Sequence, residues 1–144
     1  MKMAAVPLGI DGKSEASVPR ALVVENDLVG RELLARVLRQ KGFVAQTAIG
    51  AAQAAEVLLG ADFRFDLLLV DLNLEPVDGV ELLRHLVSLP VDRRPLKIVA
   101  ISDALAPFYP RLSELQLDLE LFQKPVHLPS LMKVLAEING GYET

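Results

Sequence analysis

Residues 67–79, Leu-Leu-Leu-Val-Asp-Leu-Asn-Leu-Glu-Pro-Val-Asp-Gly, set the predicted architecture of the chain. Four apolar residues run into Asp71 without interruption, which is typical of a strand buried on both faces of a parallel sheet. Pro76 then indicates a loop, and Asp78 is a good N-cap for a helix that begins at Gly79. The side chain of Asp71 would therefore emerge at the carboxyl end of a central strand, where open α/β sheets bind their ligands.

The chain on either side alternates short apolar runs with helical stripes. Pro107 and Pro110 interrupt the stretch 104–116, so its helix must begin near or after Pro110 or break there, because an interior proline costs about 3 kcal/mol. Five strands alternating with five helices predict a doubly wound parallel sheet with helices on both faces. We expect the other strands over 21–24, 43–48, 97–101 and 119–122, and the other helices over 28–41, 51–59, 79–88 and 129–138. The expected core-facing stripes are Leu33, Leu34, Val37 and Leu38; Val80, Leu83 and Val87; and Leu131, Val134, Leu135 and Ile138.

Length and composition limit the possible functions. The chain has 144 residues, a net charge of −4 and no cysteine, which disfavours a nucleic-acid or membrane partner and excludes disulfides and thiolate sites. We expect one domain over 20–139, preceded by a flexible extension at 1–19 and followed by a tail at 140–144. The few residues after that domain leave no room for an output domain, so we expect a stand-alone protein. The lack of cysteine fits a reducing compartment, so we expect it to be cytoplasmic.

Polar residues follow the predicted strands, and all of them would meet at one rim of the sheet. Taken singly, each has a simpler interpretation: acids can complement a helix N-terminus, Asp71 can end a strand and cap a turn, and Ser102 and Lys124 can be solvated. Together they suit phosphoryl chemistry, with oxygen ligands for Mg²⁺, a hydroxyl and a lysine for phosphoryl oxygens, and Asp71 as nucleophile. The residues at the strand ends are Glu25, Asn26, Asp27, Asp71, Asn73, Ser102 and Lys124.

From about residue 21 to 138 the chain resembles the receiver domain of the two-component response-regulator family. The motifs that carry the resemblance are Leu-Val-Val-Glu-Asn-Asp at 22–27 with Arg31 beyond it, Leu-Val-Asp-Leu-Asn-Leu-Glu-Pro-Val-Asp-Gly at 69–79, Ile-Ser at 101–102 and Lys-Pro at 124–125. The resemblance implies a flavodoxin-like sheet of strand order 2-1-3-4-5.

The resemblance also implies roles for the residues at the rim. Asp71 would be the phosphoacceptor, Ser102 the switch hydroxyl, and Lys124 the partner of the phosphoryl group. Glu25 and Asn26 would occupy the positions of the acidic pair, and Mg²⁺ would be held there with Asp71 and the backbone carbonyl of Asn73. A histidine kinase or phosphotransfer protein would be the donor in a phosphorelay, and a downstream protein would bind the switched face; the domain itself would not be an enzyme.

Four positions depart from the family pattern. Asn26 places a neutral amide where the family usually has a Mg²⁺-binding carboxylate, and Asp103 places an anion where a small residue is usual. Leu121 replaces the aromatic residue three positions before the lysine, with Phe122 expected to face the core, and Pro76 lies one residue later than usual. Of these departures, Asn26 predicts weaker Mg²⁺ binding. Asp71, Ser102 and Lys124 are intact, so we still expect a receiver that can be phosphorylated.

Other functions remain open at this point. A pseudo-receiver, which binds a partner without phosphorylation, is favoured by Asn26, Asp103 and the interrupted fourth helix. An aspartate-nucleophile hydrolase of the haloacid dehalogenase type would need an acid where Asn73 stands. No glycine-rich loop follows the first strand to support a flavodoxin-like cofactor site. His85 is expected to be solvated and His127 to lie in a loop.

Overall fold

The computed structural model describes residues 18–141 and contains a five-stranded parallel sheet in the order β2-β1-β3-β4-β5. This confirms the predicted fold class, with β3 in the centre and β2 at an edge. Most boundaries lie within one or two residues of those expected. The strands are β1 (Arg20–Val24), β2 (Val44–Ala48), β3 (Leu67–Asp71), β4 (Lys97–Ser102) and β5 (Leu119–Gln123). The helices are α1 (Leu28–Gln40), α2 (Ala51–Gly60), α3 (Gly79–Val87), α4 (Tyr109–Ser113) and α5 (Leu128–Gly141), with short 3₁₀ turns η2 (Val91–Arg93) and η3 (Ala106–Phe108).

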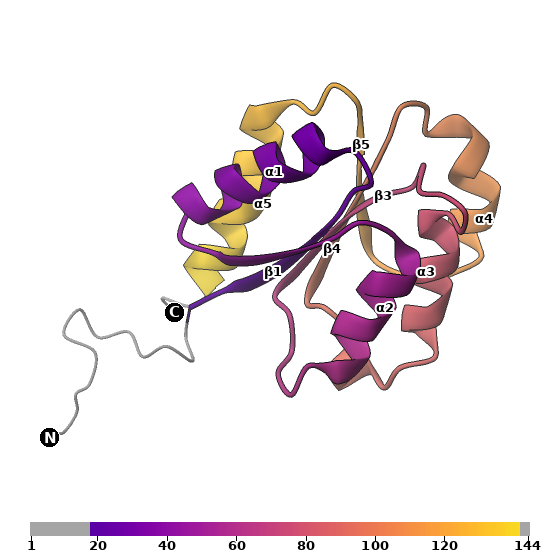
Figure 1. Cartoon of the computed structure of the whole chain (residues 1–144), viewed down its shortest axis with the longest axis horizontal. Coiled ribbons are helices and arrows are strands. Elements are labelled where there is room, and N and C mark those ends of the chain that lie inside the picture. The colour runs from indigo at the N-terminus through magenta and orange to yellow at the C-terminus, as the bar shows by residue number, and fades with distance from the viewer. Residues whose placement is uncertain (1–17, 142–144) are drawn as a thin grey trace, which may run out of the picture.

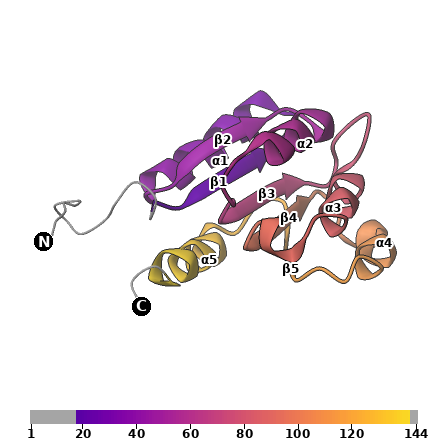
Figure 2. The same ribbon diagram turned by 90° about the horizontal axis from the view of Figure 1, so that it is seen from below.

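Helices cover both faces of the sheet. Helices α1 and α5 lie on one face and α2, α3 and α4 on the other (Figure 1), and the view from below shows the sheet between these layers (Figure 2). Alternate residues of the central strands therefore enter two different cores. In β1, Leu22 and Val24 face the core beneath α2 and α3, whereas Ala21 and Val23 face the core beneath α1 and α5, and all four are fully buried.

Two of the expected apolar stripes are wrong at one position each. Leu33 is 59% exposed. The buried line of α1 runs through Ala35 and Leu38. Successive helix residues are rotated by about 100°, so Leu33, two residues before Ala35, lies on a different side of the helix. Val87 is 37% exposed at the end of α3, where Leu86 is buried instead. The α5 stripe is confirmed, since its four members are buried or packed against the core.

The segment with two prolines forms a broken helix, as predicted. Pro107 lies in the 3₁₀ turn η3, and Pro110 lies in the first turn of the five-residue α4. A proline is tolerated in the first turn because the N–H that it lacks has no partner within the helix. The helical path is therefore kept, but only in two short pieces.

The structure describes only part of the two predicted terminal segments. Of the extension at 1–19, residues 1–17 lie outside the described residues, and so do residues 142–144 of the tail. Within residues 18–141, no helix is both long enough and apolar enough to cross a membrane.

Candidate functional site

Asp71 lies at the carboxyl end of the central strand and is only 3% exposed. The loop after it is fixed at both ends: Leu72 N–H donates to the carbonyl of Ile101 at 2.7 Å, and Gly79 N–H donates to the carbonyl of Leu72 at 3.1 Å. Asp78 caps α3, accepting a hydrogen bond from the backbone N–H of residue 81 at 3.1 Å, as predicted. The sheet and α3 together hold the carboxylate of Asp71 in a defined place.

Lys124 joins two buried carboxylates at this rim. Its Nζ lies 2.9 Å from Oδ2 of Asp71 and 3.2 Å from Oε1 of Glu25, and Glu25 is also only 3% exposed. The backbone of Lys124 continues the sheet by donating its N–H to the carbonyl of Ser102 at 2.9 Å. Three side chains that follow or end β1, β3 and β5 therefore meet, although Glu25 and Lys124 are far apart in sequence.

Burial and mutual contact shift the pKa values of this cluster. Burial raises the pKa of Glu25; the N–H of Asp27 opposes that rise and the nearby charge of Asp71 adds to it. Burial acts to lower the pKa of Lys124, but the hydrogen bonds to Asp71 and Glu25 outweigh it and raise that pKa. The ammonium group therefore supplies a permanent positive charge between the carboxylates at neutral pH.

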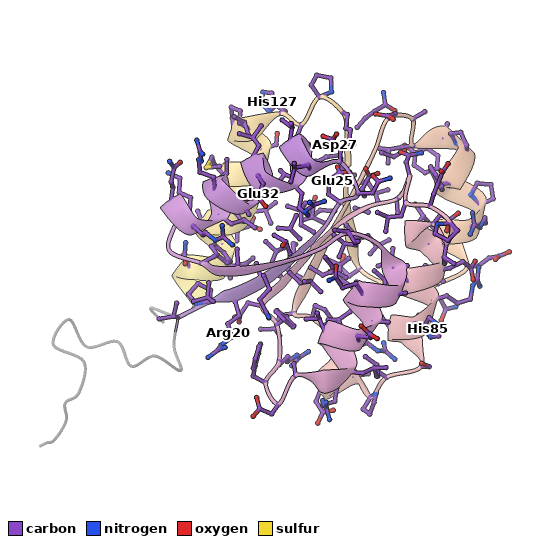
Figure 3. All side chains as sticks on the ribbon, viewed as in Figure 1. Arg20, Glu25, Asp27, Glu32, His85 and His127 are labelled. Carbon is purple, nitrogen blue, oxygen red and sulfur yellow. The ribbon has the colours of Figure 1, made fainter. Side chains whose placement is uncertain are left out.

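The residues after Glu25 divide between the rim and the next helix. Asp27 is the N-cap of α1 and accepts a hydrogen bond from Gly30 N–H at 2.8 Å, while its own N–H donates to Oε2 of Glu25 at 3.0 Å. Figure 3 shows Glu25 and Asp27 at the carboxyl end of β1, where α1 begins. Capping is thus the structural role of Asp27, as the simpler interpretation held. Asn26, between them, is exposed.

Ser102 is fully buried, and its hydroxyl is engaged within the loop that follows β4. Its Oγ lies 2.9 Å from Oδ1 of Asn73 and 2.8 Å from the carbonyl of Ala104. Asn73 also accepts from Asp103 N–H at 3.1 Å and donates its own N–H to Oδ1 of Asp71 at 2.8 Å. Sequence reasoning considered only the backbone carbonyl of Asn73 and missed this use of its side chain.

Two further residues that the sequence analysis did not select support the site. Gln123 Oε1 accepts a hydrogen bond from Leu105 N–H at 3.1 Å. Arg111, on α4, donates to both carboxylate oxygens of Asp78 at 2.7 and 3.1 Å and to Oε2 of Glu81 at 2.9 Å. The only sequence signals were indirect: Gln123 precedes Lys124, and Arg111 directly follows the second proline of the interrupted helix.

The two histidines behave as predicted. His85 is exposed on α3 (Figure 3), and His127 is exposed in the loop before α5, where its Nδ1 lies 2.7 Å from Oγ of Ser130. This contact with Ser130 holds the side chain of His127 at the start of α5.

The donor set for a cation is small. Within residues 18–141 there is no cluster of three or more His, Cys, Asp or Glu side chains suited to a metal ion. Glu25 and Asp71 nevertheless supply two buried carboxylates held by one ammonium group. Mg²⁺ is commonly bound by one or two carboxylates and several waters, so this set fits that ion.

The strand order and the place of Asp71 put the chain in the class of receiver domains, as its motifs predicted. The family model described as "Response regulator receiver domain" matches residues 21–136, and the chain belongs to that family. It is therefore a module of two-component signalling and not a conventional enzyme.

Solved structures from several bacteria have the same fold. A CheY-like receiver domain from Methylobacillus flagellatus is 28% identical with a TM-score of 0.71, and the match covers 84% of this chain and 98% of that domain. A response regulator receiver protein from Pseudomonas putida is 29% identical with a TM-score of 0.72, with 83% and 96% covered. The receiver domain of a sensor histidine kinase from Pseudomonas aeruginosa, which has a magnesium ion coordinated in its active site cleft, is 22% identical with a TM-score of 0.71, and 85% and 98% are covered; it shows the fold alone. No curated protein matches the chain.

Proposed function

We propose that this receiver accepts a phosphoryl group on Asp71 from a histidine kinase or phosphotransfer protein and then binds a downstream protein through a switched face. The observation that carries the proposal is the contact of 2.9 Å between Lys124 Nζ and Oδ2 of Asp71 at a buried rim. A buried carboxylate held by a fixed ammonium group is suited to a reaction that needs positioning and charge neutralisation. Residues 20–139 would form the working domain, in the cytoplasm.

The proposed reaction is an in-line displacement at phosphorus. A carboxylate oxygen of Asp71 forms the new P–O bond while the P–N bond to the donor histidine breaks, and the imidazole keeps the electron pair and takes up a proton. The product is an aspartyl phosphate, an acyl phosphate that water can later hydrolyse. Lys124 lies where its charge would pair with the oxygens of the transferred group.

Glu25, Asp71 and the backbone carbonyl of Asn73 would hold a Mg²⁺ ion, with the neutral amide of Asn26 beside them. When bound, the ion would neutralise charge on the phosphoryl oxygens. In the structure, Lys124 contacts both Glu25 and Asp71, so its ammonium group already neutralises part of the negative charge that would attract the ion. We therefore expect weak Mg²⁺ affinity, because the ion competes with Lys124 and gains no charge from Asn26.

The switch would be a population shift between two packings of the rim. A phosphoryl dianion on Asp71 attracts the hydroxyl of Ser102 and the ammonium group of Lys124, and whichever packing satisfies both contacts is favoured. Because Ser102 is bound to its own loop, its release would move that loop and the α4 side of the molecule.

Intact-mass measurement with acetyl phosphate and Mg²⁺ tests the proposal. Wild type should gain one phosphoryl mass, and Lys124→Ala should gain it more slowly and lose phosphate-dependent partner binding. Lys133→Ala is the matched control, because Lys133 is exposed on α5. If no condition labels the wild type, the chain is a pseudo-receiver. If Lys124→Ala and wild type are labelled and switched alike, Lys124 has no part in the mechanism.

A further inference from the structure

The loop of residues 103–105, which we call the switch loop, is held by side chains from three neighbouring strands. Its three successive N–H groups donate to Oδ1 of Asn73, to Oγ of Ser102 and to Oε1 of Gln123, each at 3.1 Å. Asn73 follows β3, Ser102 ends β4 and Gln123 ends β5. Side chains thus take the place of the regular backbone partners that a strand or helix would give these groups.

The same contacts occupy the hydroxyl of Ser102. This hydroxyl has one proton, and its two acceptors are Oδ1 of Asn73 and the carbonyl of Ala104. Among the hydrogen bonds of residues 18–141, none joins Ser102 to Asp71. A phosphoryl group on Asp71 can recruit the hydroxyl only if the contact with Asn73 or Ala104 is given up.

Asn73 connects the two halves of this arrangement. Its backbone N–H donates to Oδ1 of Asp71 at 2.8 Å, and its side chain accepts from the switch loop. A change at the carboxylate of Asp71 therefore reaches the loop through one residue. Gln123 holds the far end of the loop from the strand that leads into Lys124.

We propose that the side chains of Asn73 and Gln123 form a latch that keeps the switch loop in its resting position, and that they thereby set how readily phosphorylation switches the domain. The coupling to phosphorylation rests on the proposed function of Asp71, whereas the latch itself does not. Because the latch stabilises only the resting state, a weaker latch favours the switched state. A residue that merely supported the fold would have the opposite effect, since its loss would weaken phosphoryl binding.

Amide hydrogen exchange by NMR, without Mg²⁺ or donor, tests the latch. Gln123→Leu removes the acceptor at similar volume and should speed exchange of the Leu105 amide about fivefold, the effect of one ordinary hydrogen bond. Gln123→Glu keeps an acceptor oxygen and should restore slow exchange. Gln40→Leu, at an exposed position at the end of α1, is the control and should leave the Leu105 amide unchanged. Asn73→Ala should have the same effect on the Asp103 amide. Unchanged exchange in Gln123→Leu would overturn the latch.

Titration with beryllofluoride and Mg²⁺, a stable mimic of the phosphoryl group, tests the coupling. Gln123→Leu should bind the mimic about fivefold more tightly than wild type, by the same hydrogen-bond energy. Equal or weaker binding would overturn the coupling and leave Gln123 a purely structural residue. If wild type itself does not bind the mimic, the proposed function of Asp71 fails together with the coupling, and the exchange experiment still decides on the latch.

Discussion

Replacing Gly79 by alanine should destabilise the protein more than the same replacement at a glycine with open space around it. A Cβ on residue 79 would lie 2.6 Å from the carbonyl oxygen of Asp71, 2.8 Å from Cα of Leu72 and 3.1 Å from its Cδ2. The first two are backbone atoms at the end of β3 and directly after it, so they cannot rotate away. Helix α3 must instead move outward, which also stretches the 3.1 Å hydrogen bond from Gly79 N–H to the carbonyl of Leu72.

The size of the effect follows from these contacts. Overpacking a close contact costs about 1–3 kcal/mol, and loss of the hydrogen bond adds about 1 kcal/mol. Alanine also lowers the conformational entropy of the unfolded chain, which offsets roughly 0.4–1 kcal/mol of this loss of stability. We expect a net loss of about 2 kcal/mol in the free energy of unfolding, which corresponds to a fall in Tm of roughly 7 °C for a domain of this size.

Urea unfolding followed by far-ultraviolet circular dichroism measures this loss. Gly60→Ala is the matched control, because Gly60 is also helical and a Cβ there meets no atom within 4 Å. The control should change stability by no more than about 1 kcal/mol, in the stabilising direction. If Gly79→Ala were as stable as the control, the close approach of α3 to the end of β3 would not be a constraint on the fold.

Three further predictions concern the residues around the rim. Asn26→Asp should lower the Tm without Mg²⁺, because it adds an anion beside Glu25, and should increase the Tm rise on adding millimolar Mg²⁺; an unchanged rise would remove Asn26 from the cation site. Asp103→Ala should speed labelling by acetyl phosphate, because it removes an anion one residue from Ser102; equal initial rates by intact mass would exclude that repulsion. Arg111→Leu should speed amide exchange throughout α4, the short helix that Arg111 fixes to Asp78. Burial acts to raise the pKa of Asp78, but the hydrogen bond and charge of Arg111, together with the backbone N–H groups at the start of α3, outweigh it and the pKa is lowered. The stabilisation is therefore present above the ordinary pKa of an aspartate and is lost as the pH falls through the lowered one. The stability difference between wild type and Arg111→Leu should shrink there, and a difference that is constant from neutral to strongly acidic pH would refute the ion pair's contribution.

The spacing of apolar residues, every second residue in strands and every 3.6 residues in helices, predicts most of the fold. It does so because each element here is short and buried on a defined side. The apolar run before Asp71 predicted a strand buried on both faces, and β3 is fully buried. The stripes failed at Leu33 and Val87, because hydrophobic character alone does not reveal where a helix rotates against a sheet or where its last turn leaves the core. The break before α4 was predictable, because it follows from the backbone chemistry of proline and not from tertiary packing.

The site is less visible in the sequence than the fold. Residues at strand ends converge by topology, so the meeting of Glu25, Asp71 and Lys124 follows once a parallel sheet is accepted. The hydrogen bonds of Asn73 and Gln123 do not follow, because each joins a side chain to the backbone of a loop 18 or more positions away in the chain. Such contacts depend on loop conformation, which short-range patterns do not specify.

The phosphorylation of Asp71 is the central claim, and the most direct measurement is intact-mass and peptide mapping after incubation with acetyl phosphate and Mg²⁺. Wild type should gain a single phosphoryl group that maps to the peptide containing Asp71, and Asp71→Asn should gain none. Asp27→Asn is the neighbouring control and should label like wild type, because an asparagine can still cap α1. Stoichiometric labelling of Asp71→Asn, or labelling that disappears in Asp27→Asn and persists without Asp71, would contradict the account.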